Sequence, residues 1–206
     1  MEIRKIFVVG SGLMGSGIAQ TALQYGYEVI LNDQSKAALE RGQAGISKRL
    51  DRLVEKGRMT PEEKQACMDR LTITPSVHTA SNVDLVIEAI YENLDAKRAI
   101  FQELDNICDE HTIFASNTSS ISLTSLAAAT AHPERVVGMH FFSPVPAMGL
   151  VEIVYGLRTS QATVDVVTAV GEHMGKRTIL AKDKPGFIVN RMLLPMLNEA
   201  VQVLDE

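Results

Sequence analysis

Gly10-Ser11-Gly12-Leu13-Met14-Gly15 directly follows the stretch 3–9, which ends in four apolar residues, and this junction decides the fold. The stretch 3–9 is typical of a buried strand, and apolar residues recur at helical spacing after Gly15. A G-x-G-x-x-G between a strand and a helix is the phosphate-binding turn of dinucleotide-binding folds. Gly10 allows the tight turn, Gly12 lets the backbone approach a pyrophosphate, and Gly15 lets helix and strand pack closely. The N–H groups at the helix start face the phosphates.

Asp33 lies just beyond the second predicted strand, 18 residues after Gly15. A carboxylate at this place accepts hydrogen bonds from the ribose hydroxyls of NAD and repels the 2′-phosphate of NADP. We therefore predict NAD as the cofactor. The alternative interpretation is a plain glycine turn with an aspartate that caps a helix. The predicted cofactor-binding residues of this region are Gly10, Gly12, Leu13, Met14, Gly15 and Asp33.

Short runs rich in Val, Ile and Phe alternate with helical patterns along most of the chain. This alternation predicts an α/β fold, a doubly wound and mostly parallel sheet of Rossmann type with helices on both faces. A further strand pair, with a helix over 163–174 between its members, follows the first six strands. The predicted strands are Ile3 to Val9, Tyr27 to Leu31, Leu71 to Thr74, Leu85 to Glu88, Thr112 to Ala115, Val136 to Met139, Val151 to Tyr155 and Thr178 to Ala181.

Residues 35–70 interrupt this alternation with two helical patterns, over 35–56 and 61–69, joined by a turn at 57–60. They predict a helical hairpin inserted into the dinucleotide-binding fold. Between Lys36 and Arg70 the sequence has nine basic and six acidic residues, although the whole protein is acidic. The hairpin is either a solvated helix pair or a docking surface for a phosphorylated carrier.

Composition excludes several classes of protein. The chain has 206 residues, a formal net charge of −5 and a pI near 5.6, so nucleic acid is not a predicted partner. Cys67 and Cys108 form no C-x-x-C pair, so we predict no metal site and two reduced thiols in a cytoplasmic protein. No run of eighteen apolar residues occurs, so we predict neither a membrane span nor a membrane partner.

Three later segments are candidates for the chemistry. Residues 116–120 form a polar cluster where a parallel strand ends, which is where such folds bind ligands, although a simple helix cap explains it as well. His140 follows another strand, and Glu152 is embedded in the next one. Because an unpaired carboxylate is costly to bury, we expect Glu152 to pair with His140. The pair is either structural or a catalytic dyad. The four other histidines are expected to be exposed: His78, His111, His132 and His173.

Taken together, these motifs resemble the 3-hydroxyacyl-CoA dehydrogenase family over essentially the whole chain. The resemblance is closest to the stand-alone, short-chain type that acts on 3-hydroxybutyryl-CoA, because the nucleotide motif begins at residue 10. The motifs that carry it are the glycine turn with Asp33, the basic hairpin, Ser116-Asn117-Thr118-Ser119-Ser120, His140-Phe141-Phe142-Ser143-Pro144-Val145-Pro146, Glu152, and Lys184-Pro185-Gly186-Phe187-Ile188-Val189-Asn190-Arg191.

The resemblance implies roles for individual residues, with an acyl-CoA as the substrate. It places Ser119, His140, Glu152 and Asn190 at the catalytic positions, Ser119 and Asn190 also binding substrate. Asp33, Glu92, Lys97 and Ser119 match cofactor contacts, and Lys56 falls where the hairpin lysine of the family meets CoA. Ser143 departs from the asparagine of many members beside the nicotinamide, which implies a shorter or water-mediated contact.

The resemblance also implies a division of the chain. Residues 1–185 correspond to the NAD-binding domain, and residues 186–206 to the first helix of a C-terminal helical domain that is truncated here. Twelve of the 18 residues from Phe187 to Leu204 are apolar, and Pro195 lies within the same segment. We therefore expect an exposed apolar helix that joins copies of the chain into a homo-oligomer.

Two alternative functions stay open at this stage. One is a module that binds NAD(H) with little or no turnover. The other is a dehydrogenase of the lysine-using 6-phosphogluconate type. That class needs a catalytic lysine on a helix in the cleft, whereas Lys182 and Lys184 lie in a predicted loop before Gly186.

Overall fold

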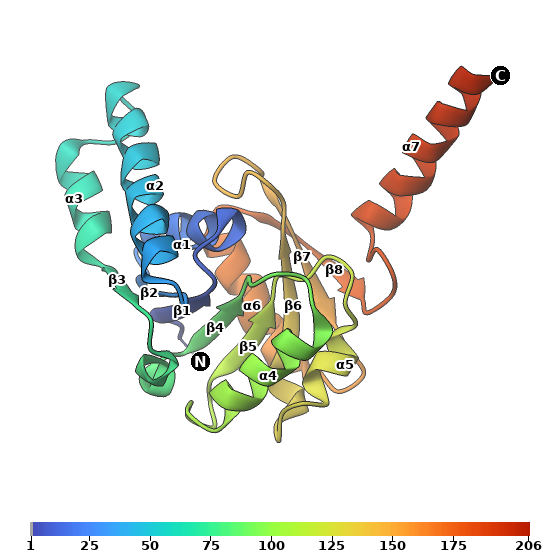
Figure 1. The fold of residues 1–206 in the computed structure, drawn as a ribbon, viewed down its shortest axis with the longest axis horizontal. Helices are drawn as coiled ribbons and strands as arrows, with labels where there is room; N and C mark the ends of the chain where they lie inside the picture. The colour runs from blue at the N-terminus through green and yellow to red at the C-terminus, as the bar shows by residue number, and fades with distance from the viewer. Residues whose placement is uncertain (1) are drawn as a thin grey trace.

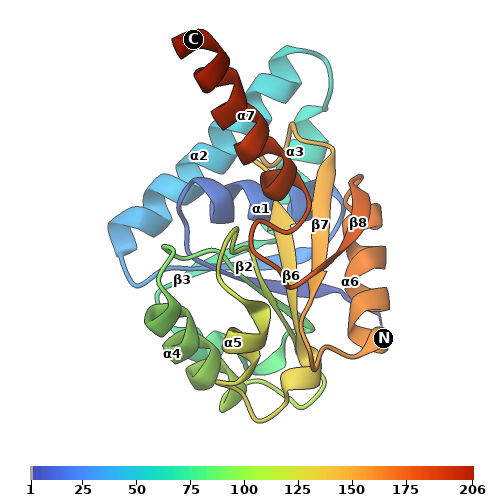
Figure 2. The same cartoon turned by 90° about the vertical axis from the view of Figure 1, so that its right-hand side faces the viewer.

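One eight-stranded sheet forms the centre of the computed structural model, which describes residues 2–206 (Figures 1 and 2). Its strands are β1 Lys5–Val9, β2 Glu28–Asn32, β3 Leu71–Thr74, β4 Leu85–Glu88, β5 Ile113–Ser116, β6 Val136–Phe141, β7 Leu150–Tyr155 and β8 Arg177–Lys182. Their order is β3-β2-β1-β4-β5-β6-β7-β8, and only β6 and β7 pair antiparallel. The mostly parallel sheet confirms the predicted fold class, and all eight predicted strands are present.

The helices are α1 Leu13–Gln24, α2 Lys36–Glu55, α3 Pro61–Asp69, α4 Leu94–Asp105, α5 Leu123–Ala127, α6 Gln161–His173 and α7 Val189–Asp205, with 3₁₀ turns at Val77–Asn82 and Pro133–Arg135. Side chains at the N-termini explain where the hairpin helices begin. The Ser35 hydroxyl accepts from the N–H of Ala38 at the start of α2. Thr60 and Glu63 form a reciprocal capping box around Pro61 at the start of α3.

Two apolar clusters, one on each face of the sheet, form the core. Residues of α1, α2 and α6, including Ile18, Ile46 and Val167, belong to one cluster. Residues of α4 and α5, including Phe101 and Leu126, belong to the other. The central strands β1, β4, β5 and β6 are therefore buried on both faces, which explains their continuous rather than alternating apolar sequences, whereas the edge strand β8 is mostly exposed.

The chain reverses its direction of winding between β1 and β4, which are neighbours in the sheet. From β1 the sheet extends to β2 and β3 on one side and from β4 to β5 and β6 on the other. In sheets of this kind a ligand crevice opens at the carboxyl ends of the two central strands. Here those ends are Val9, followed by the glycine turn, and Glu88.

The hairpin of α2 and α3 and the helix α7 extend away from the sheet (Figures 1 and 2). No residue of α7 is buried, as expected for an exposed apolar helix. Two details of the sequence prediction are wrong in this part of the chain. The helix begins at Val189, because Gly186 and Phe187 have φ of 75° and 47°, which a right-handed helix does not accept. Lys182 lies in β8 and not in a loop.

A helix that crosses a membrane must be both long and apolar. Among residues 2–206, no helix combines the length and the apolar character that crossing a bilayer requires.

Candidate active site

The turn between β1 and α1 leaves side chains no room at two of its glycines. A Cβ atom on Gly15 would lie 1.7 Å from the carbonyl oxygen of Gly10, and one on Gly10 would lie 2.6 Å from the carbonyl oxygen of Ala89. A Cβ atom on Gly12, in contrast, would meet nothing within 4 Å. The backbone is therefore open to a ligand at Gly12, the N-cap of α1, where unpaired helical N–H groups favour a phosphate.

Asp33 is half-buried directly after β2 and is held against this turn. Its Oδ2 accepts hydrogen bonds from the N–H and the hydroxyl of Ser11 at 3.0 and 2.9 Å, and its Oδ1 accepts from the N–H of Ser35 at 3.0 Å. Burial acts to raise the pKa of Asp33, but these donors outweigh it and hold the pKa below its ordinary value. Asp33 is thus a fixed anion beside the glycine turn, and it caps no helix.

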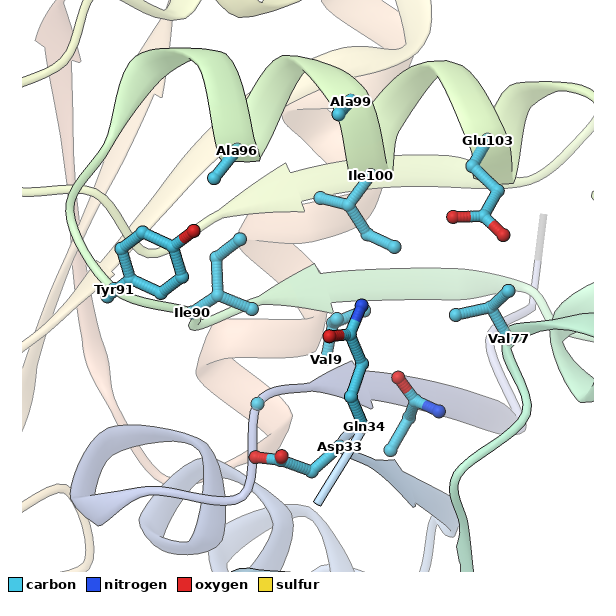
Figure 3. Close-up of a pocket in the computed structure, with 12 residues that line it drawn as sticks. Val9, Asp33, Gln34, Val77, Ile90, Tyr91, Ala96, Ala99, Ile100 and Glu103 are labelled. Carbon is cyan, nitrogen blue, oxygen red and sulfur yellow. The ribbon is translucent and has the colours of Figure 1, made fainter.

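A cavity of about 300 Å³ opens beside Asp33 (Figure 3). Figure 3 shows Asp33 and Gln34 on one side of it, and Ala96 and Ile100 of α4 on the other. A mostly apolar slot next to a carboxylate that can accept ribose hydroxyls fits the adenosine half of a dinucleotide. The remaining lining residues are Val9, Gly10, Asn32, Val77, Ile90, Tyr91, Ala99 and Glu103.

Glu92 lies on the loop between β4 and α4 and connects this loop to the polar cluster after β5. Its Oε1 accepts from the hydroxyls of Thr118 and Ser120 at 2.5 and 2.9 Å and from the N–H of Ser119 at 3.1 Å. Burial acts to raise the pKa of Glu92, but the Thr118 hydrogen bond and the charge of Lys97 hold the pKa below its ordinary value. Lys97 Nζ lies 3.3 Å from Glu92 Oε2, and its side chain is only 1% exposed.

His140 and Glu152 face each other across the antiparallel pair of β6 and β7. The Nδ1 atom of His140 lies 2.7 Å from Oε2 of Glu152, with both side chains buried. Because a carboxylate accepts, Nδ1 is the nitrogen that carries the hydrogen in the neutral form of the ring, and that form has its lone pair on Nε2. Oε1 of Glu152 accepts from the N–H groups of Ile188 and Val189, both at 2.9 Å. The expected pair is present, and it also holds the start of α7.

A second cavity of about 340 Å³ brings these groups together. The cofactor candidates Glu92 and Lys97 line it from one side of the sheet, and His140 from β6. Predicted residues from four separate segments therefore meet at one site. The lining residues are Met14, Ala89, Ile90, Glu92, Lys97, Asn117, Ser119, His140, Phe141, Phe142 and Ser143.

Comparison with known proteins agrees with this geometry. The sequence pattern of the 3-hydroxyacyl-CoA dehydrogenase NAD-binding domain matches residues 5–184. The chain belongs to this family. A probable 3-hydroxybutyryl-CoA dehydrogenase of Bacillus subtilis is 48% identical over the whole chain, which spans 72% of that protein. These findings confirm the predicted family and NAD as its cofactor.

Solved structures of relatives confirm the Rossmann-type fold of this 3-hydroxyacyl-CoA dehydrogenase family member. The 3-hydroxybutyryl-CoA dehydrogenase of Escherichia coli K12 superposes with a TM-score of 0.97 at 41% identity, and the chain covers 43% of it. The (S)-3-hydroxybutyryl-CoA dehydrogenase of Ralstonia eutropha gives a TM-score of 0.97 at 46% identity, and 99% of this chain covers 72% of that structure.

Six predicted site residues line neither cavity: Gly12, Leu13, Gly15, Lys56, Glu152 and Asn190. Gly12, Leu13 and Gly15 belong to the glycine turn and the start of α1, and Glu152 contacts the second cavity through His140. Asn190 lies in the first turn of α7, next to Val189, whose N–H is bound by Glu152. Lys56 follows the last residue of α2 and lies exposed at the far end of the hairpin. Among residues 2–206, no salt bridge involves Lys56. The four other histidines are exposed, as expected.

Three residues of the site were not singled out from the sequence. Phe187, whose backbone has a φ of 47°, packs its ring with the centroid 5.6 Å from that of His140. Asn117 accepts the N–H of Phe141 at 3.0 Å and so connects the polar cluster to β6. Glu88 is fully buried at the end of β4 and binds Lys97. The sequence signal for Glu88 is the same as for Glu152, an acid within an apolar strand.

Proposed function

We propose that this protein interconverts 3-hydroxyacyl-CoA and 3-ketoacyl-CoA with NAD, and that His140 and Glu152 form its general acid–base dyad. The substrate carries a short acyl chain: it is 3-hydroxybutyryl-CoA in the oxidation direction and acetoacetyl-CoA in the reverse direction. The names of the relatives support this choice. The observation that carries the proposal is the buried pair of His140 and Glu152 at a cavity shared with Glu92, Lys97 and Ser119. Membership of the family does not by itself assign the dyad or the individual contacts, so both belong to the proposal.

In the oxidation direction, the 3-hydroxyl must lose its proton as a hydride leaves C3. Imidazole is suited to this task because its ordinary pKa lies near neutrality, and Nε2 of His140 is the available acceptor. Glu152 then stabilises the imidazolium through Nδ1 and keeps the ring in place. NAD, when bound, accepts the hydride.

Positioning falls to polar side chains around the dyad. Ser119 lines the cavity and its N–H is held by Glu92, so we assign it to the substrate oxygen and to the cofactor. Asn190, one residue beyond the N–H that binds Glu152, is assigned to the substrate as well. Ser143 lines the same cavity and is assigned to the nicotinamide.

Deuterium transfer tests the reaction itself. NADH carrying two deuterium atoms at C4 is incubated with acetoacetyl-CoA and the protein, and the product is analysed by mass spectrometry. We expect 3-hydroxybutyryl-CoA with one deuterium at C3. Product without deuterium, or no product, would contradict the proposal.

Asp33 is expected to set the choice between cofactors. Its fixed charge beside the glycine turn repels the 2′-phosphate, so NADH should bind at least about 10²-fold more tightly than NADPH. Fluorescence titration of both cofactors measures the ratio. Asp33→Asn should reduce the preference for NADH over NADPH. Equal affinities of the wild-type protein for NADH and NADPH would contradict the assignment of Asp33.

Lys56 is expected to bind the phosphates of CoA from the hairpin. Lys56→Glu should raise the Michaelis constant about tenfold for acetoacetyl-CoA, and much less for an acetoacetyl-pantetheine analogue that lacks the nucleotide phosphates. Arg158→Glu, an equal charge change at an exposed loop residue between β7 and α6, serves as the control. An equal change for both substrates would mean that the hairpin is only a solvated helix pair.

An NAD(H)-binding module with little turnover is the alternative function. The observation that favours it is that α7, which carries Asn190, has no buried residue. An NAD(H)-binding module would bind NADH but would not consume it when a 3-ketoacyl-CoA is added, whereas a dehydrogenase would consume it.

Three organisational predictions belong with the proposal. Copies of the chain associate through the exposed apolar residues of α7, among them Met192, Leu194 and Val201. Residues 1–185 are the NAD-binding domain and 186–206 the first helix of a helical domain. The location of the protein is the cytoplasm.

A further inference from the structure

Glu88 is a buried carboxylate that the reaction described above does not use. It is the last residue of β4, with no exposed surface, and its two oxygens receive three donors. Oε1 accepts from the N–H of Ile90 at 2.7 Å and from Lys97 Nζ at 2.6 Å, and Oε2 accepts from the hydroxyl of Ser116 at 2.6 Å. All three neighbours donate hydrogen bonds, and a carboxylate can accept from all of them.

Through these contacts Glu88 joins three segments of the site. Ile90 belongs to the loop between β4 and α4, Lys97 to α4, and Ser116 to β5. The Ser116 hydroxyl in turn accepts the N–H of Thr118 at 3.1 Å, within the turn that carries Ser119. Glu88 therefore helps to place both the lysine and the polar cluster that line the second cavity.

The charges in this group do not cancel. Lys97 lies between two carboxylates, Glu88 at 2.6 Å and Glu92 at 3.3 Å. One ammonium group and two carboxylates leave a net charge of minus one. Burial of Glu88 and Lys97 reduces screening by water and salt, whereas Glu92 is 39% exposed. The net charge lies at the edge of the cavity that His140 also lines.

We propose that Glu88, by giving Lys97 a second carboxylate, makes the nicotinamide end of the site favour the oxidised cofactor over the reduced one. This inference rests on the proposed function, because His140 marks the cavity as the place of the nicotinamide. The oxidised ring carries a positive charge and the reduced ring carries none. A net negative cluster beside the nicotinamide ring stabilises the oxidised ring and leaves the energy of the reduced ring nearly unchanged.

The substitution Glu88→Gln separates charge from shape. The amide oxygen can still accept from Ile90 and Lys97, and the amide nitrogen can donate to the Ser116 hydroxyl oxygen, although the Ser116 hydroxyl then no longer donates to this side chain. We expect the ratio of the Kd for NAD⁺ to the Kd for NADH to rise about three- to tenfold. Calorimetry measures the first constant, and fluorescence titration measures the second. A purely structural role would weaken both forms equally.

Asp84→Asn is the matched control. Asp84 immediately precedes the same strand and binds the N–H groups of Arg4 and Lys5 at the opposite end, about 13 Å away along β4. This variant removes the same charge and should leave the ratio unchanged. An unchanged ratio in Glu88→Gln, or an equal shift in both variants, overturns the proposal. Wild-type protein that binds neither form would instead contradict the cofactor site of the proposed function.

A second variant covers the case in which Glu88→Gln does not fold. Glu92→Gln removes the other carboxylate from the same lysine, and Glu92 is partly exposed on a loop, so the core is not disturbed. The ratio of the Kd for NAD⁺ to the Kd for NADH should rise in this variant as well, even if the lost contacts increase both dissociation constants. A constant ratio in this variant contradicts the charge argument.

Discussion

Replacing His140 by Gln is expected to lower turnover by roughly 10²–10⁴-fold, the usual contribution of a general base. Glutamine can keep a hydrogen bond to Glu152, but it has no nitrogen that takes up a proton. The loss corresponds to about 3 to 5 kcal/mol of activation free energy. The affinity for NADH should barely change, because Asp33 and the glycine turn lie on other strands. Steady-state kinetics and NADH titration measure the two effects separately.

His111→Gln is the control for this experiment. His111 is exposed in the turn before β5 and belongs to neither cavity of the site, so its replacement should leave turnover unchanged. Near wild-type turnover in His140→Gln would mean that the buried pair is structural, and the proposed mechanism would be wrong.

Replacing Glu152 by Gln is expected to lower turnover by roughly 10²-fold or more, through the tautomer of His140. The N–H groups of Ile188 and Val189 require an oxygen, so the amide nitrogen is turned towards Nδ1 of His140. Nδ1 must then accept, and the hydrogen moves to Nε2, which can no longer take the substrate proton. Turnover should fall while the melting temperature of the protein changes little.

A surface pair provides the matched control for Glu152. His132 Nδ1 lies 3.3 Å from Glu134 Oε1, and both side chains are about half exposed. Glu134→Gln alters a histidine–glutamate pair away from the site and should not affect turnover. If Glu152→Gln instead lowers the melting temperature sharply and keeps its activity, the carboxylate serves folding rather than catalysis.

The sheet could be predicted because its physical signal is local. Strands buried on both faces are continuous apolar runs in the sequence. The glycine turn directly follows the first of these runs, which is where a dinucleotide-binding fold has its phosphate-binding turn. Predicted and observed strand ends mostly agree within two residues. The pairing of His140 with Glu152 was predictable as well, since a buried carboxylate needs a partner and the neighbouring strand offers one.

Other features depend on contacts between distant segments and could not be predicted. Phe187 contacts His140 from a residue whose backbone has a φ of 47°, a conformation that no helical pattern indicates. Glu152 binds the start of α7 through two N–H groups that lie 36 and 37 residues away in the sequence. Glu88 was predictable in principle, because the argument used for Glu152 applies to any acid in an apolar strand.

Single-turnover oxidation of NADH tests the central claim most directly. The protein is mixed in excess over acetoacetyl-CoA with NADH bound, and the absorbance of NADH is followed. We predict that one NADH is consumed per acetoacetyl-CoA, and that His140→Gln slows this step by roughly 10²-fold or more. Tight binding of NADH with no consumption of it in the wild-type protein would contradict the claim.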